Sequence, residues 1–276
     1  MTKITCITEN TAQFGSAFWG EHGISFCIET AQGSVLFDTG QTAAILLHNL
    51  ALLEKSLCDF DVIVLSHAHN DHTGGLSTVL AQRPGLPLYA NPDIARPRFI
   101  RKDGHYQFIG LPMSMDALGQ FADLKLSADP VEVLPGVWTT GEIHERPELE
   151  GRGPNLFVPD GEGWRPDPYL DDLSMVVETA QGLVIVLGCC HAGLLNTLAH
   201  VTRVFERQPI AVLGGTHLVS AEGTALQHIV DVLRTAYPAL HLYPNHCTGQ
   251  RAYVALSSAL GDYVHPCPAG TTITFD

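Results

Sequence analysis

Four apolar runs of strand length in this chain each lead to a histidine. The runs are DVIVLS (61–66), LVIVLG (183–188), PIAVLGG (209–215) and ALHLYP (239–244), and the histidines that follow them are His67, His191, His217 and His246. A continuous apolar run is typical of a strand that is buried on both faces of a sheet. In layered α/β proteins, ligands gather beyond the carboxyl ends of such strands. The pattern therefore predicts an α/β fold with a histidine-rich site at one edge of its sheets.

The remaining segments predict how the strands are covered. Apolar residues recur at helical spacing over 42–55, from about residue 73, and over 193–206, 221–236 and 248–260, whereas 3–8, 24–30, 34–38 and 271–275 have the composition of short strands. This alternation favours one layered domain that spans residues 1–276. Residues 91–172 are rich in Pro and Gly and have little periodicity, so we expect an insert there that acts as a lid or pocket wall.

A cluster of histidines and one aspartate follows the first of these runs. His67 and His69 are separated by one residue and project to the same side of an extended segment. Asp71 and His72 follow as the chain turns into a helix. Imidazole nitrogen and carboxylate oxygen are the ligands of zinc and of some non-haem iron sites. A histidine-rich surface loop is the simpler alternative, but the position directly after a buried strand favours a metal site.

Several motifs of the chain resemble those of a known superfamily. HAHNDHTGG (67–75) looks like the HxHxDH signature of the metallo-β-lactamase-fold superfamily, and LFDTG (36–40) resembles its first Asp motif. A narrower resemblance lies in EHGIS (21–25), GCCHAG (188–193), GGTHL (214–218) and NHCTG (245–249). These segments are similar to a subgroup of metal-dependent hydrolases that resemble 7,8-dihydropterin-6-yl-methyl-4-(β-D-ribofuranosyl)aminobenzene 5'-phosphate synthase.

The resemblance implies an αββα sandwich with a pair of metal ions in the cleft between the sheet edges. It assigns His67, His69 and His191 to one metal, and Asp71, His72 and His246 to the second. Asp38 would order the histidine loop through hydrogen bonds. The implied cofactor is Zn²⁺, two ions per chain, with Mn²⁺ or Fe²⁺ as alternatives. The wider superfamily carries a bridging Asp where this chain has GGTHL, so His217 is left to ligate one metal, bind substrate or shuttle a proton.

The leading functional interpretation is a hydrolase that acts on a small anionic ester, such as a phosphate-bearing one, through a metal-activated water. Asp71 would ligate a metal and orient the nucleophile, and His217 would protonate a leaving group or hold an oxyanion. The alternative is a mononuclear iron dioxygenase of the thiol or persulfide type, or another redox protein on the same fold. His69 disfavours a diiron version, because diiron members carry a carboxylate at that position.

Composition limits the partners of the chain. It has 15 basic and 29 acidic residues and a net charge of −14, which disfavours binding to a nucleic-acid backbone or to an anionic membrane. The longest apolar stretch, at 43–54, is interrupted by His48 and Asn49 and is too short to span a bilayer. We find no secretory signal and no disulfide framework, so we expect a cytoplasmic enzyme with a small-molecule substrate. Its oligomeric state is not predicted.

Candidate substrate contacts come from two segments. Eight of the fifteen basic residues fall within 96–165, and they are Arg96, Arg98, Arg101, Lys102, Lys125, Arg146, Arg152 and Arg165. The planar guanidinium suits phosphate and carboxylate, so we predict Arg98 and Arg101 as substrate contacts, with a solvated basic turn as the alternative. The resemblance places Glu21 and His22 near the site, with a surface pair as the alternative. The three cysteines beside the ligand histidines, Cys189, Cys190 and Cys247, are expected mainly to pack in the interior, with soft metal ligands or oxidation-prone thiols as the alternatives.

Overall fold

The computed structural model describes all 276 residues, and most of its strands form two large sheets. The first contains, in spatial order, β17 (Thr272–Phe275), β1 (Thr2–Thr8), β2 (Ser25–Thr30), β3 (Gly33–Phe37), β4 (Val62–Val64), β5 (Leu86–Ala90) and β8 (Ala122–Leu126). The second contains β16 (His241–Asn245), β15 (Pro209–Gly215), β14 (Leu183–Leu187), β13 (Ser174–Glu178), β10 (Val137–Thr139) and β9 (Glu132–Leu134). Buried side chains of both sheets, among them Phe26 and Val186, form one apolar cluster between them.

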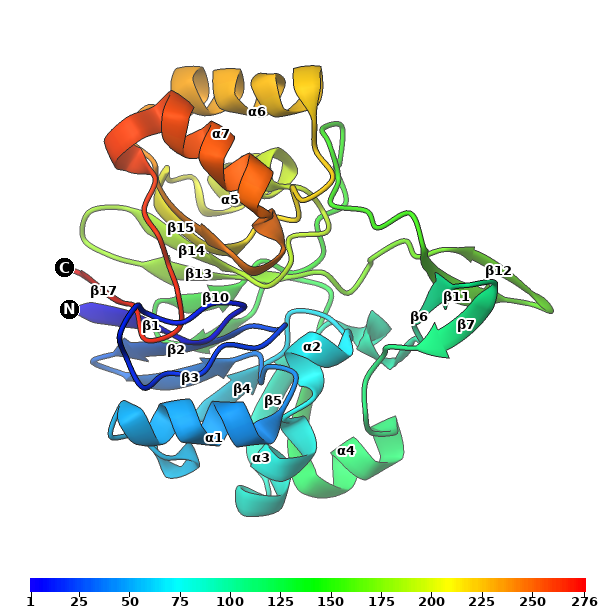
Figure 1. Cartoon of the computed structure of the whole chain (residues 1–276). Helices are drawn as coiled ribbons and strands as arrows, with labels where there is room; N and C mark the ends of the chain where they lie inside the picture. Colours follow the sequence, from blue (N-terminus) through cyan, green and yellow to red (C-terminus); the bar gives the residue numbers. More distant parts are fainter.

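Helices cover the outer face of each sheet (Figure 1). The chain order of the helices is α1 (Ala43–Leu52), α2 (Asn70–Thr73), α3 (Leu76–Gln82), α4 (Met115–Phe121), α5 (Leu194–Phe205), α6 (Gly223–Ala236) and α7 (Gln250–Leu260). Short 3-10 helices occupy Leu57–Asp59, Pro92–Ala95, His246–Thr248 and Gly261–Tyr263. Because α1, α3 and α4 lie below the first sheet and α5, α6 and α7 above the second, the predicted αββα architecture is confirmed. The helices are all too short or too polar to traverse a bilayer.

Parallel pairing brings the functional loops to one edge. In the first sheet β3, β4 and β5 run parallel, and in the second β14, β15 and β16 do so. Every residue of β4 and β14 is buried, as the continuous apolar runs predict. Parallel strands share the edge at which their carboxyl ends emerge, so the loops after β3, β4, β14, β15 and β16 can meet there.

The structure differs from the expectation of one continuous insert at 91–172. Within that segment β8 joins the first sheet, and β9 and β10 join the second. The rest includes a small separate sheet of β12 (Gly163–Pro166), β11 (Leu156–Asp160), β6 (Phe99–Lys102) and β7 (His105–Phe108), in that spatial order. This small sheet projects from the body of the molecule on the side where α2 lies (Figure 1).

The helix expected from about residue 73 begins earlier and is interrupted. α2 covers Asn70–Thr73, and α3 starts only at Leu76. Gly74 and Gly75 lie between them because the backbone of residues 39–41 passes so near that a Cβ on either glycine would overlap its carbonyl oxygens. The close approach is fixed by the Gly74 amide, which donates to the Gly40 carbonyl at 3.0 Å.

Candidate metal centre

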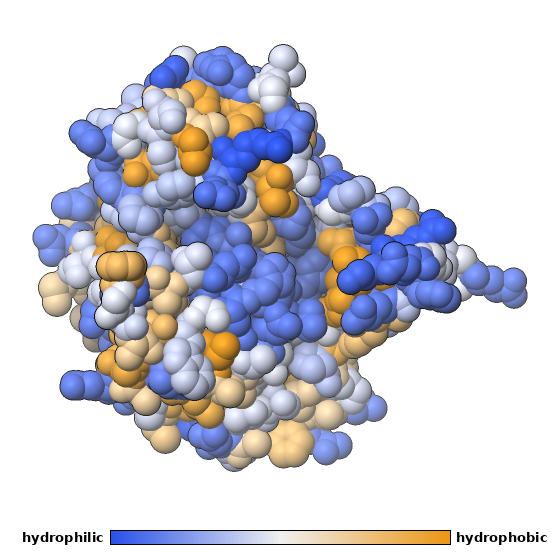
Figure 2. Space-filling view, viewed as in Figure 1, coloured by the Kyte–Doolittle hydropathy of each residue, from blue (hydrophilic) through white to orange (hydrophobic).

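The loops that follow the parallel strands bring five histidines and one aspartate together. In Figure 2 hydrophilic residues gather in a hollow between the two layers and the projecting sheet. The His67 ring centroid lies 4.1 Å from that of His72 and 4.9 Å from that of His191. His246 adds a ring 5.2 Å from His72. Side chains from both sheets therefore surround one small volume.

The members of each set of three that the resemblance assigns to one metal lie close together. In the first, His67 Nε2 and His69 Nδ1 face each other at 3.0 Å, and the His191 ring lies 5.2 Å from that of His69. In the second, Asp71 Oδ2 is 3.4 Å from His246 Nε2 and 3.7 Å from His72 Nε2. Spacing alone does not separate the two sets, because the rings of His67 and His72, one from each set, lie 4.1 Å apart.

The outer nitrogens of four histidines are held by acceptors. His67 Nδ1 contacts Ser66 Oγ at 2.8 Å, His72 Nδ1 contacts Asp38 Oδ2 at 2.7 Å, His191 Nδ1 contacts the Gly151 carbonyl at 2.6 Å and His246 Nδ1 contacts Asn10 Oδ1 at 2.9 Å. An Nδ1–H that donates to such an acceptor leaves the lone pair on Nε2, which is the usual arrangement of a metal-binding histidine.

The inner nitrogens are available to a cation. Nε2 of His191 and of His246 is buried and has no hydrogen-bond partner. An unpaired buried polar atom is costly unless a ligand satisfies it. The donor set of imidazoles and one carboxylate fits a divalent cation such as zinc.

Burial sets the protonation of most of these groups. It lowers the pKa of His69 to about 3, and it lowers the pKa of His67 and His191 well below the ordinary value. These imidazoles are therefore neutral, as metal ligands must be. Burial acts to raise the pKa of Asp71, but His72 and His246 outweigh it and hold that pKa well below its usual range. Burial acts to lower the pKa of His72, but Asp71 and Asp38 outweigh it and raise that pKa to about 9. The site thus offers one carboxylate beside three neutral imidazoles, and His72 must lose a proton to bind a cation.

Asp38 orders the histidine loop, as the resemblance implies. Its Oδ1 accepts from the Ser66 amide at 2.7 Å, and its Oδ2 accepts from the Ser66 hydroxyl and from His72, both at 2.7 Å. Asp38 is fully buried and has a φ of 57°, an unusual backbone conformation for a residue other than glycine. Strain of this kind persists where surrounding contacts fix the residue, here three hydrogen bonds to the metal loop.

Two adjacent carboxylates, which the sequence leaves either near the cleft or in a capping or solvated role, hold two loops of the centre. Asp171 Oδ2 accepts from the Ala68 amide, and Asp172 Oδ2 accepts from the Ala192 amide, each at 2.8 Å. Ala68 and Ala192 belong to the two loops that carry His67 and His191. The one available signal was the pair of acids just before a buried strand, and that signal is equally typical of a solvated turn.

The prediction that Arg98 contacts substrate is wrong. Its side chain is fully buried and forms ion pairs with Asp171 at 2.6 Å, Asp93 at 2.9 Å and Asp167 at 3.0 Å. Because the guanidinium is surrounded by three carboxylates, it has no free face for an anionic ligand. Arg98 instead fixes Asp171, which in turn holds the metal loop at Ala68.

The other predicted substrate contacts, Glu21, His22 and Arg101, lie in three different surroundings. His22 is 68% exposed on its side chain and lies at the mouth, with Nε2 3.3 Å from Asp71 Oδ2. Glu21 is turned to the start of α1, where it accepts from the Gln41 and Thr42 amides at 3.0 Å. Arg101 lies on the small sheet with its guanidinium 5.9 Å from the Tyr106 ring centroid.

His217 borders the first group of ligands. Its ring centroid is 4.4 Å from that of His191, and its Nδ1 is buried without a hydrogen-bond partner. Its amide donates to Cys247 Sγ at 3.3 Å, and its φ is 47°. The position at the rim is compatible with each of the roles that the sequence leaves open.

Comparison with known proteins places these features in a family. The family model of the metallo-beta-lactamase superfamily matches residues 21–172. The chain is 30% identical over 264 residues to the 7,8-dihydropterin-6-methyl-4-(beta-D-ribofuranosyl)-aminobenzene-5'-phosphate synthase of Methanocaldococcus jannaschii, covering 91% of this chain and 88% of the relative. It is 31% identical to an uncharacterized protein of the same organism, covering 95% and 96% respectively.

Solved structures show the same architecture. Tm1679, described as a metal-dependent hydrolase of the beta-lactamase superfamily, superposes with a TM-score of 0.85 at 24% identity, and the match covers 100% of both chains. Zn(2+)-bound PqqB from Methylobacterium extorquens superposes with a TM-score of 0.58 at 11% identity, covering 99% of this chain and 100% of that one. Together with the family match and the synthase relative, these likenesses show that the chain belongs to the metallo-beta-lactamase superfamily of enzymes.

Proposed function

We propose that this chain is a hydrolase with two zinc ions that cleaves a small phosphate-bearing ester. The observation that carries the proposal is the orientation of the histidines. Four of them have Nδ1 engaged by an acceptor, which leaves Nε2 directed into the shared volume. Metal-binding histidines usually have this arrangement, so it supports a site for cations.

The ligands divide between two ions. His67, His69 and His191 would hold the first, and Asp71, His72 and His246 the second. Two bound divalent cations supply a hydroxide near neutral pH and polarise the electrophile. Zinc is proposed because neutral imidazoles and a carboxylate are its usual ligands, although Mn²⁺ and Fe²⁺ accept the same donors.

Asp71 and His217 carry the proton chemistry in this proposal. One oxygen of Asp71 faces the histidines, and the carboxylate as a whole is 13% exposed, so its other oxygen can accept a hydrogen bond from the attacking water. His217 lies beside His191 with Nδ1 unpaired, and from that position the imidazole can protonate the leaving group.

The phosphate-bearing character of the substrate is supported by the relative and by charge. The name of the M. jannaschii synthase includes a 5'-phosphate. Five of the eight basic residues at 96–165 are paired with acids, but Arg101, Lys102 and Arg165 on the small sheet form no ion pair. The base of that sheet is fixed beside the metal loop through Arg98 and Asp171. Three cationic side chains of the projecting sheet that pair with no acid favour an anionic ligand.

The proposal is tested with a panel of phosphodiesters, phosphomonoesters, lactones and thioesters. Asp71→Asn is expected to lower kcat by about 10²–10⁴-fold on the best substrate, because it weakens a ligand and the acceptor for the water. Asp123→Asn is the matched control, since Asp123 is half-exposed and pairs only with Lys125. Wild-type turnover by Asp71→Asn would contradict the proposal. So would a protein that contains one iron per chain, consumes oxygen with a thiol and hydrolyses nothing on the panel.

A further inference from the structure

We propose that the thiolate of Cys189 is a shared ligand that bridges the two metal positions. This inference rests on the two-metal centre of the proposed function and adds to it a sulfur ligand. Cys189 lies two residues after the end of β14, directly after Gly188, and it is 3% exposed. Its sulfur lies 3.2 Å from His72 Nε2.

The position of this sulfur relative to both groups of ligands carries the argument. Ligand atoms of His67, Cys189 and His191 all lie within 4.8 Å of one another, and so do those of His72, Cys189 and His246. The same Sγ therefore belongs to both constellations. A donor atom at this location faces the space where each of the two cations would lie.

The predicted ligands carry little negative charge, and this gives an anionic sulfur a role at the centre. The histidines at the centre supply no negative charge, and Asp71 is the one carboxylate among the six predicted ligands. Two dications in a buried volume repel each other strongly, and an anionic ligand between them offsets this repulsion. A thiolate is a strong zinc ligand and has more than one lone pair, whereas a neutral imidazole such as His217 has one.

The step that creates the bridge is an acid–base reaction. The S–H bond of Cys189 breaks, its proton passes to solvent, and the sulfur lone pairs form bonds to the cations. A coordinating thiol is deprotonated in this way by the charge of the metal. No electron is gained or lost.

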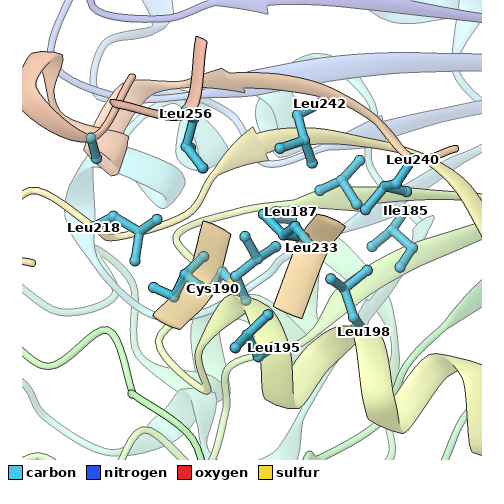
Figure 3. Packing of buried hydrophobic residues seen from close by; sticks show 14 of the residues in the cluster. Ile185, Leu187, Cys190, Leu195, Leu198, Leu218, Leu233, Leu240, Leu242 and Leu256 are labelled. Atoms are coloured by element: carbon cyan, nitrogen blue, oxygen red, sulfur yellow. The ribbon is translucent and has the colours of Figure 1, made fainter. Parts of the chain in front are cut away.

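Neighbouring cysteines provide matched controls. Cys190 lies among the leucines between the second sheet and its helices, as Figure 3 shows, and its sulfur contacts Thr197 Oγ1 at 3.3 Å. Cys247 Sγ receives the His217 amide at 3.3 Å and lies 3.5 Å from the Cys189 carbonyl. It is near Cys189 and His217 but belongs to neither of the two groups that contain Cys189 and two histidines.

The test is X-ray absorption at the zinc edge of the zinc-loaded protein, together with the near-ultraviolet spectrum of the Co²⁺-loaded form. We expect a sulfur scatterer at about 2.3 Å and a thiolate-to-cobalt charge-transfer band in wild type, Cys190→Ser and Cys247→Ser. Cys189→Ser is expected to lose both signals and at least tenfold in metal affinity. Wild-type protein is itself a test, so the result does not depend on the folding of Cys189→Ser.

The outcomes separate this inference from the proposed function. Two zinc ions with only nitrogen and oxygen scatterers in wild type would overturn the bridging thiolate and leave the hydrolase proposal intact. Loss of the sulfur signal in Cys247→Ser but not in Cys189→Ser would also overturn it. A sulfur signal that Cys189→Ser alone removes, in a protein that hydrolyses nothing, would support the bridge and contradict the hydrolase.

Discussion

Each oriented histidine of the centre is held by a different kind of acceptor: a hydroxyl for His67, a carboxylate for His72, a backbone carbonyl for His191 and an amide for His246. The acceptors come from segments as far apart in the chain as Asn10 and Gly151. A metal-binding ring that is fixed through its second nitrogen loses little freedom when the cation binds. Affinity for the metal therefore depends on residues that never touch it.

His217 is expected to act on substrate more than on metal. Its ring lies against His191 at the rim and has a free Nδ1, which suits proton transfer. His217→Ala should lower kcat by about 10²–10⁴-fold while two metal ions per chain remain. Steady-state kinetics and elemental analysis of the same preparation measure both quantities. Loss of half the bound metal in His217→Ala would make this residue a ligand instead.

Arg98 is expected to matter for stability and not for substrate binding. Removing it would leave the carboxylates of Asp167 and Asp171 buried and unpaired. Breaking a buried pair in this way costs about 3–5 kcal/mol, so Arg98→Ala should lower the free energy of unfolding in urea by that amount. Arg101→Ala, at an exposed position, should change it by less than about 0.5 kcal/mol. Equal unfolding free energies for the two variants would refute the structural role.

At the scale of elements, the ends of β4 and β14 approach so closely that no side chain fits between them. A Cβ on Gly188, just after β14, would overlap the Ser66 hydroxyl and reach Asp38 Oδ2 at 3.2 Å. Both atoms belong to the hydrogen bonds that hold His67 and His72. The close contact of the two strand ends is therefore part of the metal centre.

Gly188→Ala should loosen this contact. We expect it to destabilise the fold by about 1–3 kcal/mol through overpacking and to weaken metal binding by about 10–100-fold through the displaced Ser66. Gly119→Ala is the control, because a Cβ on this residue of α4 would meet only Leu124, at 3.9 Å. It should be neutral or stabilising by about 0.5–1 kcal/mol. Urea unfolding and competition with a metal chelator provide the two measurements, and wild-type values for Gly188→Ala would contradict the account.

The strands and helices of the two main layers could be predicted from the sequence, because burial leaves a simple apolar pattern in them. β14 and α5 begin and end within a residue or two of the predicted ranges. The small sheet could not be predicted in this way. Every residue of β12 is exposed, so the strand has no alternation of buried and exposed positions to detect. Arg98 was misjudged for a related reason, since two of the three acids that surround it, Asp167 and Asp171, are distant in sequence.

For the molecule as a whole, the metal centre joins the two layers. Asp171 and Asp172 hydrogen-bond a loop of the first sheet at Ala68 and a loop of the second at Ala192. These adjacent carboxylates fix the two halves of the ligand set relative to each other. Histidines after buried strands were visible in the sequence, but their division into two metal groups came from the family resemblance. Spacing along the chain does not specify which loops of two different sheets face each other.

Anomalous diffraction at the zinc edge, on crystals of protein purified without added metal, tests the central claim most directly. We expect two peaks per chain. One should lie about 2.0–2.2 Å from nitrogens of His67, His69 and His191, and the other should be bound by Asp71, His72 and His246. A single peak, an absorption edge of iron in place of zinc, or a metal bound outside these six side chains would contradict the two-zinc centre on which the proposed hydrolysis depends.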